Sequence, residues 1–291
     1  MEFYTGKELL SECTNNALLI SEVMKKREIS NTGIKNEEID SRMREVLKIM
    51  KNSVYKPIEN PSKSIGGLIG GEAAAVFKHA NKRNSVCGLV LSKAIAYSMA
   101  VLEVNASMGL IVAAPTAGSS GVIPGVLLAV AEEKNLDDEK IIAGLYNSSA
   151  VGYLLMRNSS VSGAEAGCQA EVGAASAMAA SAIVEIMGGT PQMSLNAASF
   201  ALSNLLGLVC DPIAGLVESP CQSRNAIGVS NALTSAELAL SGISHVIPFD
   251  EMVEAMYRVG KSLPFELRET AMGGNAGTPK GCKLKCAICK E

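Results

Sequence analysis

Three cysteines are the residues of this 291-residue chain whose surroundings most clearly suggest chemistry. Cys168 lies in Gly163-Ala-Glu-Ala-Gly-Cys-Gln-Ala-Glu-Val-Gly173, and Cys210 and Cys221 enclose Asp-Pro-Ile-Ala-Gly-Leu-Val-Glu-Ser-Pro. Glycine, proline and acidic residues surround each thiol, in place of a plain apolar stripe. Three thiolates on separate turns could hold an iron–sulfur cluster and leave one iron open to substrate. An open metal position distinguishes a catalytic site from a structural one.

Charged residues near these cysteines are candidates for proton transfer and substrate binding. Glu165 and Glu171 flank Cys168, where a carboxylate could act as a base or support a ligand, or equally cap a helix or pair structurally. Arg224 follows Cys221 closely and could bind a substrate carboxylate. Its alternative role is an ion pair with a nearby acid. The sequence does not assign the base.

Two glycine-rich loops each open an expected helix, at Ser64–Glu72 and at Pro115–Gly121. Free backbone N–H groups at a helix start, with the helix dipole, favour an anion. Neither loop contains the lysine of a phosphate loop, so a small carboxylate fits better than a nucleotide. The alternative is a tight turn or close helix packing. The substrate-binding candidates in these loops are Ser64, Gly66, Gly67, Thr116, Gly118, Ser119 and Ser120.

Lys63 and the two histidines of the chain, His79 and His245, are weaker catalytic candidates. Lys63 could be read as a pyridoxal phosphate lysine, but the chain lacks the βα pattern that such enzymes show, so we expect no pyridoxal phosphate. The alternative without a catalytic role is that Lys63 is a solvated loop residue. Nothing places either histidine beside a nucleophile, which argues against a serine triad, and their scarcity argues against a histidine-bound zinc.

A second group of cysteines lies near the end of the chain, at Cys282, Cys286 and Cys289. Their spacing resembles the cluster motif of radical S-adenosylmethionine enzymes, but that motif belongs near the start of a barrel of strands and helices. The remaining interpretations are thiols without a role, a small zinc clip, or a tail cysteine that reaches the main cluster. Cys13 and Cys87 fall on apolar helical positions and are expected in the core.

Composition excludes several classes of function. The net charge of −3, the 4% aromatic content and the absence of tryptophan predict neither nucleic acid nor membrane as a partner. We see no secretory signal and no clean apolar span in the longest uncharged runs, and therefore expect a cytoplasmic protein. Eight cysteines in such a protein favour metal binding or catalysis over disulfides.

The periodicity of apolar residues is helical throughout, which predicts an all-α fold. Between 141 and 249 charge is sparse and small residues abound, as expected for close-packed, buried helices. We expect a helical segment over 1–56 that packs on an all-α catalytic domain over 57–291 and forms one continuous domain with it, with Gly/Pro loops carrying the site. Pro57 marks the boundary, and the tail after Gly273 reads as irregular. Further helices are expected near 72–83, 92–108, 121–135, 138–157, 166–187, 193–209, 222–241 and 250–260.

Taken together, these segments resemble the alpha subunit of the iron–sulfur-dependent L-serine dehydratases. The resemblance covers nearly the whole chain from about residue 60 onward, and the two cysteine segments are long and specific. Ala170 stands where many relatives have glycine, and Ser120 where some have cysteine. The matching segments are Ser64–Glu72, Ala114–Gly125, Gly163–Gly173, Cys210–Asn225 and Glu269–Gly274.

The resemblance implies an all-α domain that holds a [4Fe–4S] cluster through Cys168, Cys210 and Cys221. It implies conversion of L-serine to pyruvate and ammonia, with the open iron acting as a Lewis acid on the substrate hydroxyl. The family's Ser-Ser-Ser-His-Thr-type motif and ACT-like regulatory region lie in another domain or chain. That motif is absent here, so we expect a separate beta subunit and hence a heterodimer. In some relatives a tail cysteine occupies the open iron, a role open to Cys282, Cys286 or Cys289.

Two other functions remain open at this point. One is an iron–sulfur L-cysteine desulfidase on the same scaffold, which would release sulfide in place of water. The other is a non-enzymatic iron–sulfur protein, an electron carrier or a sensor, in which a fourth cysteine would complete the ligands of the cluster.

Overall fold

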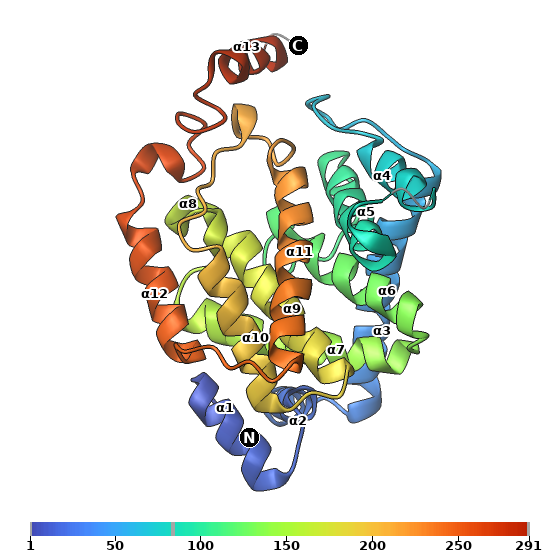
Figure 1. The fold of residues 1–291 in the computed structure, drawn as a ribbon, viewed down its shortest axis with the longest axis vertical. Coiled ribbons are helices and arrows are strands. Elements are labelled where there is room, and N and C mark those ends of the chain that lie inside the picture. The colour runs from blue at the N-terminus through green and yellow to red at the C-terminus, as the bar shows by residue number, and fades with distance from the viewer. Residues whose placement is uncertain (1, 83–84, 290–291) are drawn as a thin grey trace.

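The computed structural model describes residues 2–82 and 85–289. Across these residues the chain is built from helices and loops, and its only strand-like pairing is an isolated bridge between Cys210 and Arg268. The expected all-α fold is confirmed (Figure 1). The α-helices are α1 (Gly6–Asn16), α2 (Ile20–Thr32), α3 (Asn36–Glu59), α4 (Glu72–Ala80), α5 (Gly88–Ala106), α6 (Val122–Lys134), α7 (Asp138–Asn158), α8 (Gly163–Ala166), α9 (Ala174–Ile186), α10 (Pro191–Asn204), α11 (Cys221–Leu240), α12 (Phe249–Ser262) and α13 (Pro279–Ile288).

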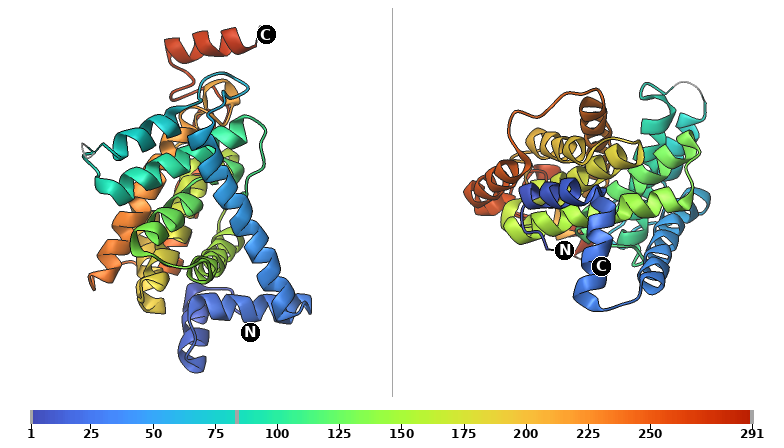
Figure 2. Two further views of the ribbon diagram at one scale, coloured as in Figure 1. Left: turned by 90° about the vertical axis from the view of Figure 1, so that its right-hand side faces the viewer. Right: turned by 90° about the horizontal axis from the view of Figure 1, so that it is seen from below.

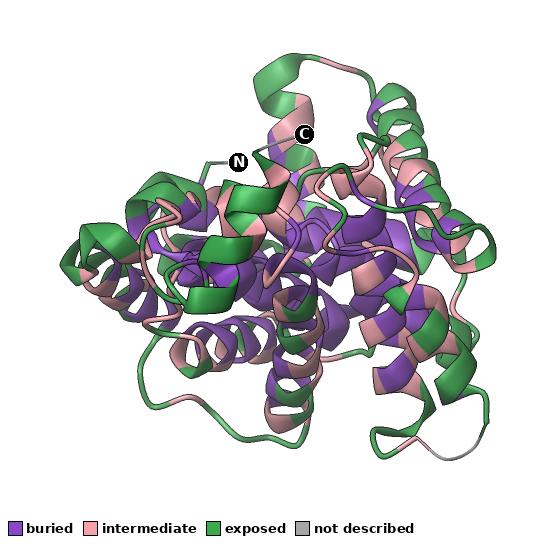
Figure 3. Cartoon of the chain, turned by 90° about the horizontal axis from the view of Figure 1, so that it is seen from above, coloured by how far each residue is buried: buried purple, intermediate pink, exposed green. Residues whose placement is uncertain are grey.

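Helix α9 is the centre of the molecule. Every one of its residues is buried, and it packs against α6, α7, α10 and α11. Alanine and serine make up most of α9, and such small side chains let the surrounding helices approach closely. Figure 3 shows the same pattern, with buried residues on the inner helices and exposed residues on the outer ones. The small-residue segment of the sequence is therefore the core.

Helices α5 and α6 meet through glycine, and this contact supports the second glycine-rich loop. A Cβ atom on Gly125 would lie 2.9 Å from the carbonyl oxygen of Ala94, and one on Gly121 would collide with the carbonyl of Ser98. Glycine is therefore required where the chain passes from the loop into α6. The loop is held close to the core from its first turn onward.

The N-terminal helices lie along one side and one end of the bundle (Figure 2). Ala17 adopts the left-handed conformation (φ 52°) and ends α1. The apolar residues Leu9 and Met24 therefore lie on separate helices, α1 and α2. Helix α2 packs on α7, and α3 packs on α5. Pro57 does not end α3 as expected, since the helix continues to Glu59 and Pro57 is buried within it.

The segment expected as one helix over 166–187 is divided. Gly167 (φ +76°) separates α8 from a π-helical turn, η2 (Gln169–Gly173), which leads into α9. A Cβ atom at Gly167 would lie 2.7 Å from the carbonyl oxygen of Leu208, so only glycine fits there. Single π turns inside helices are frequent at functional sites. Here the turn begins directly after Cys168.

The tail is not irregular throughout, as the sequence suggested. Thr278 caps α13 by accepting a hydrogen bond from the N–H group of Gly281 (3.0 Å), and Pro279 occupies the first helical position. Helix α13 contacts the turn η3 (Ile213–Gly215), which lies between Cys210 and Cys221. In Figures 1 and 2 it stands apart from the main bundle.

One helix in the described part of the chain, α5, is long and apolar enough to cross a membrane, with a mean hydropathy of 1.3 over its best window. Half of that window is buried in the protein, where α5 packs against α3, α4, α6 and α11. Core helices commonly meet the same criterion, so the finding carries little weight as a sign of a membrane span.

Candidate functional site

The three cysteines singled out by the sequence are all buried free thiols. Cys168 stands at the start of η2, Cys210 lies in the loop after α10, and Cys221 is the first residue of α11. The pKa of the Cys210 thiol is raised above its ordinary value first by burial, then by Glu171, and also by Cys168 and Cys221. Three separate segments of the chain thus bring these thiols within electrostatic reach of one another.

The pKa of each of the three thiols is raised, which favours its neutral form. Burial, with a smaller contribution from Glu171, raises the pKa of Cys168 to about 12, while Arg224 opposes the shift. The pKa of Cys221 is also raised, by burial first and then by Cys168 and Glu171. A positively charged group among the thiols would reverse this balance and favour the thiolates.

Glu171 connects the cysteines to the second glycine-rich loop. Its Oε1 atom accepts a hydrogen bond from Oγ1 of Thr116 (2.7 Å), and the Cys210 thiol donates to its Oε2 atom at 3.7 Å. Two glycines make room for the carboxylate. A Cβ atom on Gly163 would lie 2.5 Å from Oε2, and one on Gly118 would lie 3.1 Å from Oε1. Burial raises the pKa of Glu171, and the Thr116 hydroxyl opposes this.

Arg224 forms the ion pair that the sequence offered as its alternative role. Its guanidinium lies 2.7 Å from the buried carboxylate of Asp211 and donates to the carbonyl of Val209 (2.7 Å). Asp211 also accepts hydrogen bonds from the backbone and side chain of Asn275 (2.6 and 2.9 Å). Arg224 therefore fixes the loop around Cys210 to the segment near Asn275. Its role in binding a substrate remains a prediction.

The first glycine-rich loop already holds an anion from the chain itself. Glu218 accepts hydrogen bonds from Oγ of Ser64 (2.6 Å), from the N–H of Gly66 (2.7 Å) and from the N–H of Leu68 (2.9 Å). The N–H of Gly67 donates to the carbonyl of Ser64. A substrate carboxylate at Ser64, Gly66 or Gly67 would have to displace Glu218.

The second loop is held differently, by an amide. Asn225 donates to the carbonyl of Gly118 (2.8 Å) and accepts from the N–H of Gly121 (3.1 Å). The hydroxyls of Thr116 and Ser119 lie 3.2 Å apart, and Oγ of Ser120 donates to the carbonyl of Ala117. Among the described residues the N–H groups of Ala117 and Gly118 donate to no protein acceptor.

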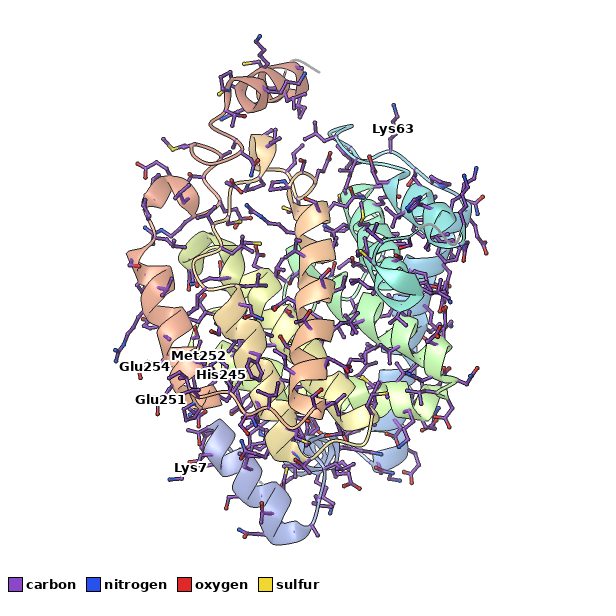
Figure 4. The ribbon with its side chains drawn as sticks, in the orientation of Figure 1. Lys7, Lys63, His245, Glu251, Met252 and Glu254 are labelled. Atoms are coloured by element: carbon purple, nitrogen blue, oxygen red, sulfur yellow. The ribbon has the colours of Figure 1, made fainter. Side chains whose placement is uncertain are left out.

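Other candidates do not join this site. Lys63 is exposed and extends away from the body in Figure 4, and Glu165 is exposed and accepts a hydrogen bond from Ser160 (2.7 Å). His79 is exposed. His245 lies at the opposite end of the molecule from Lys63, where its ring bonds to the backbone of Ile247 (Figure 4).

The remaining cysteines are divided by their exposure. Cys13 is buried as expected, but Cys87 is exposed, because it precedes α5 as the capping residue and does not lie on its inner face. Cys282, Cys286 and Cys289 are free and exposed on α13, and the Cys282 thiol lies 3.7 Å from the carbonyl of Ala276. Their assignment to a cluster stays a prediction.

Sequence reasoning gave no role to three residues that build the site. Asp211, Glu218 and Asn225 all lie in or directly after the segment enclosed by Cys210 and Cys221. Acids and amides in an uncharged stretch are costly to bury without a partner. This cost could have marked Asp211, Glu218 and Asn225 as residues with buried partners, although it does not indicate which loop each one contacts.

The chemistry of the three thiols fits an iron–sulfur cluster better than a single metal ion. In the described part of the chain no three His, Cys, Asp or Glu side chains converge as ligands of one ion. Ligands of a cluster bind different irons and therefore do not have to converge on one point. Three buried, soft sulfur donors without histidine suit such a group.

Comparison with known proteins was made on the whole chain. Residues 15–276 match the family described as serine dehydratase alpha chain. The chain is 46% identical to a probable L-serine dehydratase alpha chain of Bacillus subtilis, over 98% of this chain and 95% of that protein. It is 45% identical to the L-serine dehydratase alpha chain of Peptoniphilus asaccharolyticus, over 99% and 98%.

Longer relatives also match. The L-serine dehydratase TdcG of Escherichia coli is 34% identical over 94% of this chain, which spans 62% of that protein. The sequence resemblance drawn from the cysteine segments and glycine-rich loops is thus confirmed over nearly the full length. The chain belongs to the family of serine dehydratase alpha chains.

Proposed function

We propose that this chain is the catalytic subunit of an iron–sulfur enzyme that converts L-serine to pyruvate and ammonia. One observation carries the proposal. Three buried free thiols, Cys168, Cys210 and Cys221, lie within electrostatic reach of one another, and Cys210 contacts Glu171, which in turn touches the glycine-rich loop at Thr116. The identity of the substrate, L-serine, is inferred from the relatives that are named L-serine dehydratase.

The three thiols would hold a [4Fe–4S] cluster. When bound, it would supply an open iron position able to act as a Lewis acid toward the serine hydroxyl. Asp211 and Arg224 keep the loop that carries Cys210 in place through their ion pair (2.7 Å).

Glu171 is the best placed of the three base candidates to take the Cα proton. Lys63 is exposed and Glu165 is exposed, whereas Glu171 is enclosed between Cys210 and Thr116. The Cα–H electrons would form the Cα–Cβ double bond as the Cβ–O bond breaks. The departing hydroxide would become water by taking up the proton that Glu171 has accepted. The resulting aminoacrylate would rearrange to an imine and hydrolyse to pyruvate and ammonia.

The substrate carboxylate would lie on the second loop. The N–H groups of Ala117 and Gly118, which have no acceptor among the described residues, and the hydroxyl group of Ser119 are donors in one turn, next to Glu171. The first loop is the poorer choice because Glu218 already uses its donors.

A separate beta chain and a cytoplasmic location complete the proposal. The relatives of equal length are named alpha chains, and the longer relatives carry additional sequence in one chain. The beta chain would bring the Ser-Ser-Ser-His-Thr-type motif and an ACT-like region. All eight cysteines are free, which suits a reducing compartment.

The test is electron paramagnetic resonance of anaerobically purified alpha–beta complex, mildly oxidised, with and without L-serine, alongside pyruvate release. We expect a cluster signal that serine alters. Cys168→Ser, Cys210→Ser and Cys221→Ser should lose iron and turnover together, whereas Cys13→Ser, also a buried thiol, should retain both.

Three outcomes would overturn the proposal. Full serine turnover by any of the three variants would remove the thiols from the mechanism. Sulfide release from L-cysteine in preference to pyruvate release from L-serine would support a desulfidase, and a signal indifferent to serine would support a non-enzymatic iron–sulfur protein.

A further inference from the structure

The connection between α5 and α6 contains an extended segment, Gly109-Leu-Ile-Val-Ala-Ala114, which we call the 109–114 segment. Residues 109–113 form no helix, turn or bend. From residue 110 to residue 114, no backbone N–H or C=O group bonds to another protein group among the described residues. A row of free backbone groups on an extended, β-branched segment is a template for an added strand.

The side chains around this segment are apolar and exposed. Leu110 is 72% exposed, its neighbour Met108 is 79% exposed, and Ile65 on the adjacent loop is 71% exposed. The N–H of Ile65 donates to the carbonyl of Ala106 (2.9 Å), which joins the two loops. Large apolar side chains gathered on one surface mark a contact with another molecule.

The same surface continues into a cleft of about 310 Å³. Residues 112–115 form one wall, and Met43, Met50, Met156 and Met178 contribute to the others. Methionine side chains adapt to the shape of a partner, which suits a surface that receives apolar side chains. The 109–114 segment therefore offers both backbone groups for pairing and a cleft for alternate side chains, the two parts of strand addition.

We propose that an extended segment of the separate beta chain pairs with the 109–114 segment and covers this surface. The inference rests on the proposed function for the existence of that partner. This chain spans 60–62% of the longer relatives, which therefore carry further sequence in the same chain as the matched part. In this protein the separate beta chain would supply the corresponding sequence. Pro115 and Thr116 follow the segment directly, so a partner bound there would lie next to Glu171.

The first experiment is amide hydrogen exchange of the iron-loaded chain, alone and with its beta chain. We expect the amides of residues 110–114 to exchange rapidly in the isolated chain. In the complex alternate amides should exchange at least about tenfold more slowly, because only every second N–H group of a strand faces its partner. Protection confined to other segments would overturn the proposal. Protection already present in the isolated chain and rising with its concentration would assign the surface to a second copy of this chain and equally overturn it.

The second experiment measures the Kd for the beta chain after substitution. Leu110→Asp should weaken binding about tenfold or more, since it places a charge at the centre of an apolar contact. The matched control is Val246→Asp, which changes an apolar residue that is 92% exposed between α11 and α12 and should alter the Kd less than about twofold. Equal effects of the two variants would contradict the proposal.

Proline substitution separates backbone pairing from apolar contact. Successive residues of a strand point their N–H groups to opposite sides, so Ile111→Pro and Val112→Pro should differ in their Kd for the beta chain. Neither N–H has a partner in the isolated chain, and the residues are already extended, so the unfolding temperature of the isolated variants should be unchanged. Equal, unaltered Kd values for both variants would exclude strand pairing.

Failure of this inference is distinguishable from failure of the proposed function. A complex that protects residues 110–114 but releases no pyruvate from L-serine would refute the function and leave the interface standing. Normal pyruvate release together with unchanged affinity of Leu110→Asp would refute the interface and leave the function standing.

Discussion

The two glycine-rich loops, 64–72 and 115–121, look alike in the sequence but hold different partners in the structure. The carboxylate of Glu218 takes up donors of the first loop, at Ser64, Gly66 and Leu68. The second loop contacts a carboxylate only through the hydroxyl of Thr116, which donates to Glu171. A glycine turn at a helix start therefore indicates a position that favours an anion, but not whether the chain or a substrate provides that anion.

This difference assigns different tasks to the loops. Glu218 lies in the segment between Cys210 and Cys221, so the first loop fixes the cysteine segment to α4 and α5. The second loop keeps free N–H groups at Ala117 and Gly118 beside Glu171. We therefore expect the first loop to be structural and the second to be the one available to a ligand.

The largest expected effect comes from Glu171→Gln at the second loop. The amide retains an acceptor for Thr116 but cannot take a proton, so turnover of L-serine should fall by about 10²–10⁴-fold, the usual contribution of a general base. Iron content should stay at the wild-type value. Turnover of L-serine and bound iron are measured on the same preparation, and unaltered turnover would remove Glu171 from the proton transfer.

Gly118→Ala tests the same loop by geometry. The new Cβ atom would lie 3.1 Å from Oε1 of Glu171, so the carboxylate must shift, and we expect turnover to fall by about tenfold to 10²-fold, as for a small misplacement of a reacting group. The control is Gly67→Ala in the first loop, where the space is open and only the left-handed backbone (φ +69°) resists. That variant should lose about 1–2 kcal/mol of stability, the cost of the left-handed conformation for a residue with a Cβ atom, and little turnover. If Gly67→Ala lost turnover and Gly118→Ala lost only stability, the first loop would be the one that binds the ligand and the second would be structural.

Much of this comparison was accessible from the sequence. The helical period and the sparse charge predicted the all-α fold and its small-residue core, because burial of a helix on every face requires such a composition. The cysteine segments stood out because glycine, proline and acids around a thiol are not needed for packing. Their mutual proximity is now seen through Glu171, which touches Cys210 and Thr116.

The partners of buried polar groups were not accessible. Glu218 and Ser64 are 154 residues apart, and no local pattern specifies that one carboxylate will reach the other loop. The division of the 166–187 segment depends in the same way on contact of Gly167 with Leu208. The sequence did not predict the tail helix, because three lysines and three cysteines in a short segment show no clear apolar period after the capping residue Thr278.

Glu218→Gln tests the structural task of the first loop. The amide group replaces an acceptor by a donor, so at least one of the donors from Ser64, Gly66 and Leu68 is left facing an N–H group. A buried unpaired donor costs about 1–3 kcal/mol, and we expect the free energy of unfolding in denaturant to fall by that amount. Glu45→Gln on the exposed face of α3 is the control. Wild-type stability of Glu218→Gln would mean that the loop does not depend on its anion.

The smallest effect is expected at Glu185, a buried carboxylate of α9 that touches neither loop. Its Oε2 atom accepts from Asn147 (2.8 Å) and from the N–H of Ser21 (3.2 Å), while Oε1 has no partner among the described residues. Burial raises the pKa of Glu185 above the ordinary value of 4.5, so the folded protein retains its proton to higher pH than the unfolded chain. The stability contributed by the protonated group is complete below pH 4.5 and is lost as the pH rises through the raised pKa.

Glu185→Gln removes this titration without removing the acceptor for Asn147. The stability of the variant should therefore not fall as the pH rises through the raised pKa, and the variant should gain relative to the wild type by about 1 kcal/mol in total. Denaturant unfolding at several pH values measures the difference. Both oxygens of Glu218 accept hydrogen bonds, whereas Oε1 of Glu185 has no partner among the described residues. If the difference in unfolding free energy between Glu185→Gln and the wild type did not change with pH, the number of donors would not distinguish the two buried carboxylates.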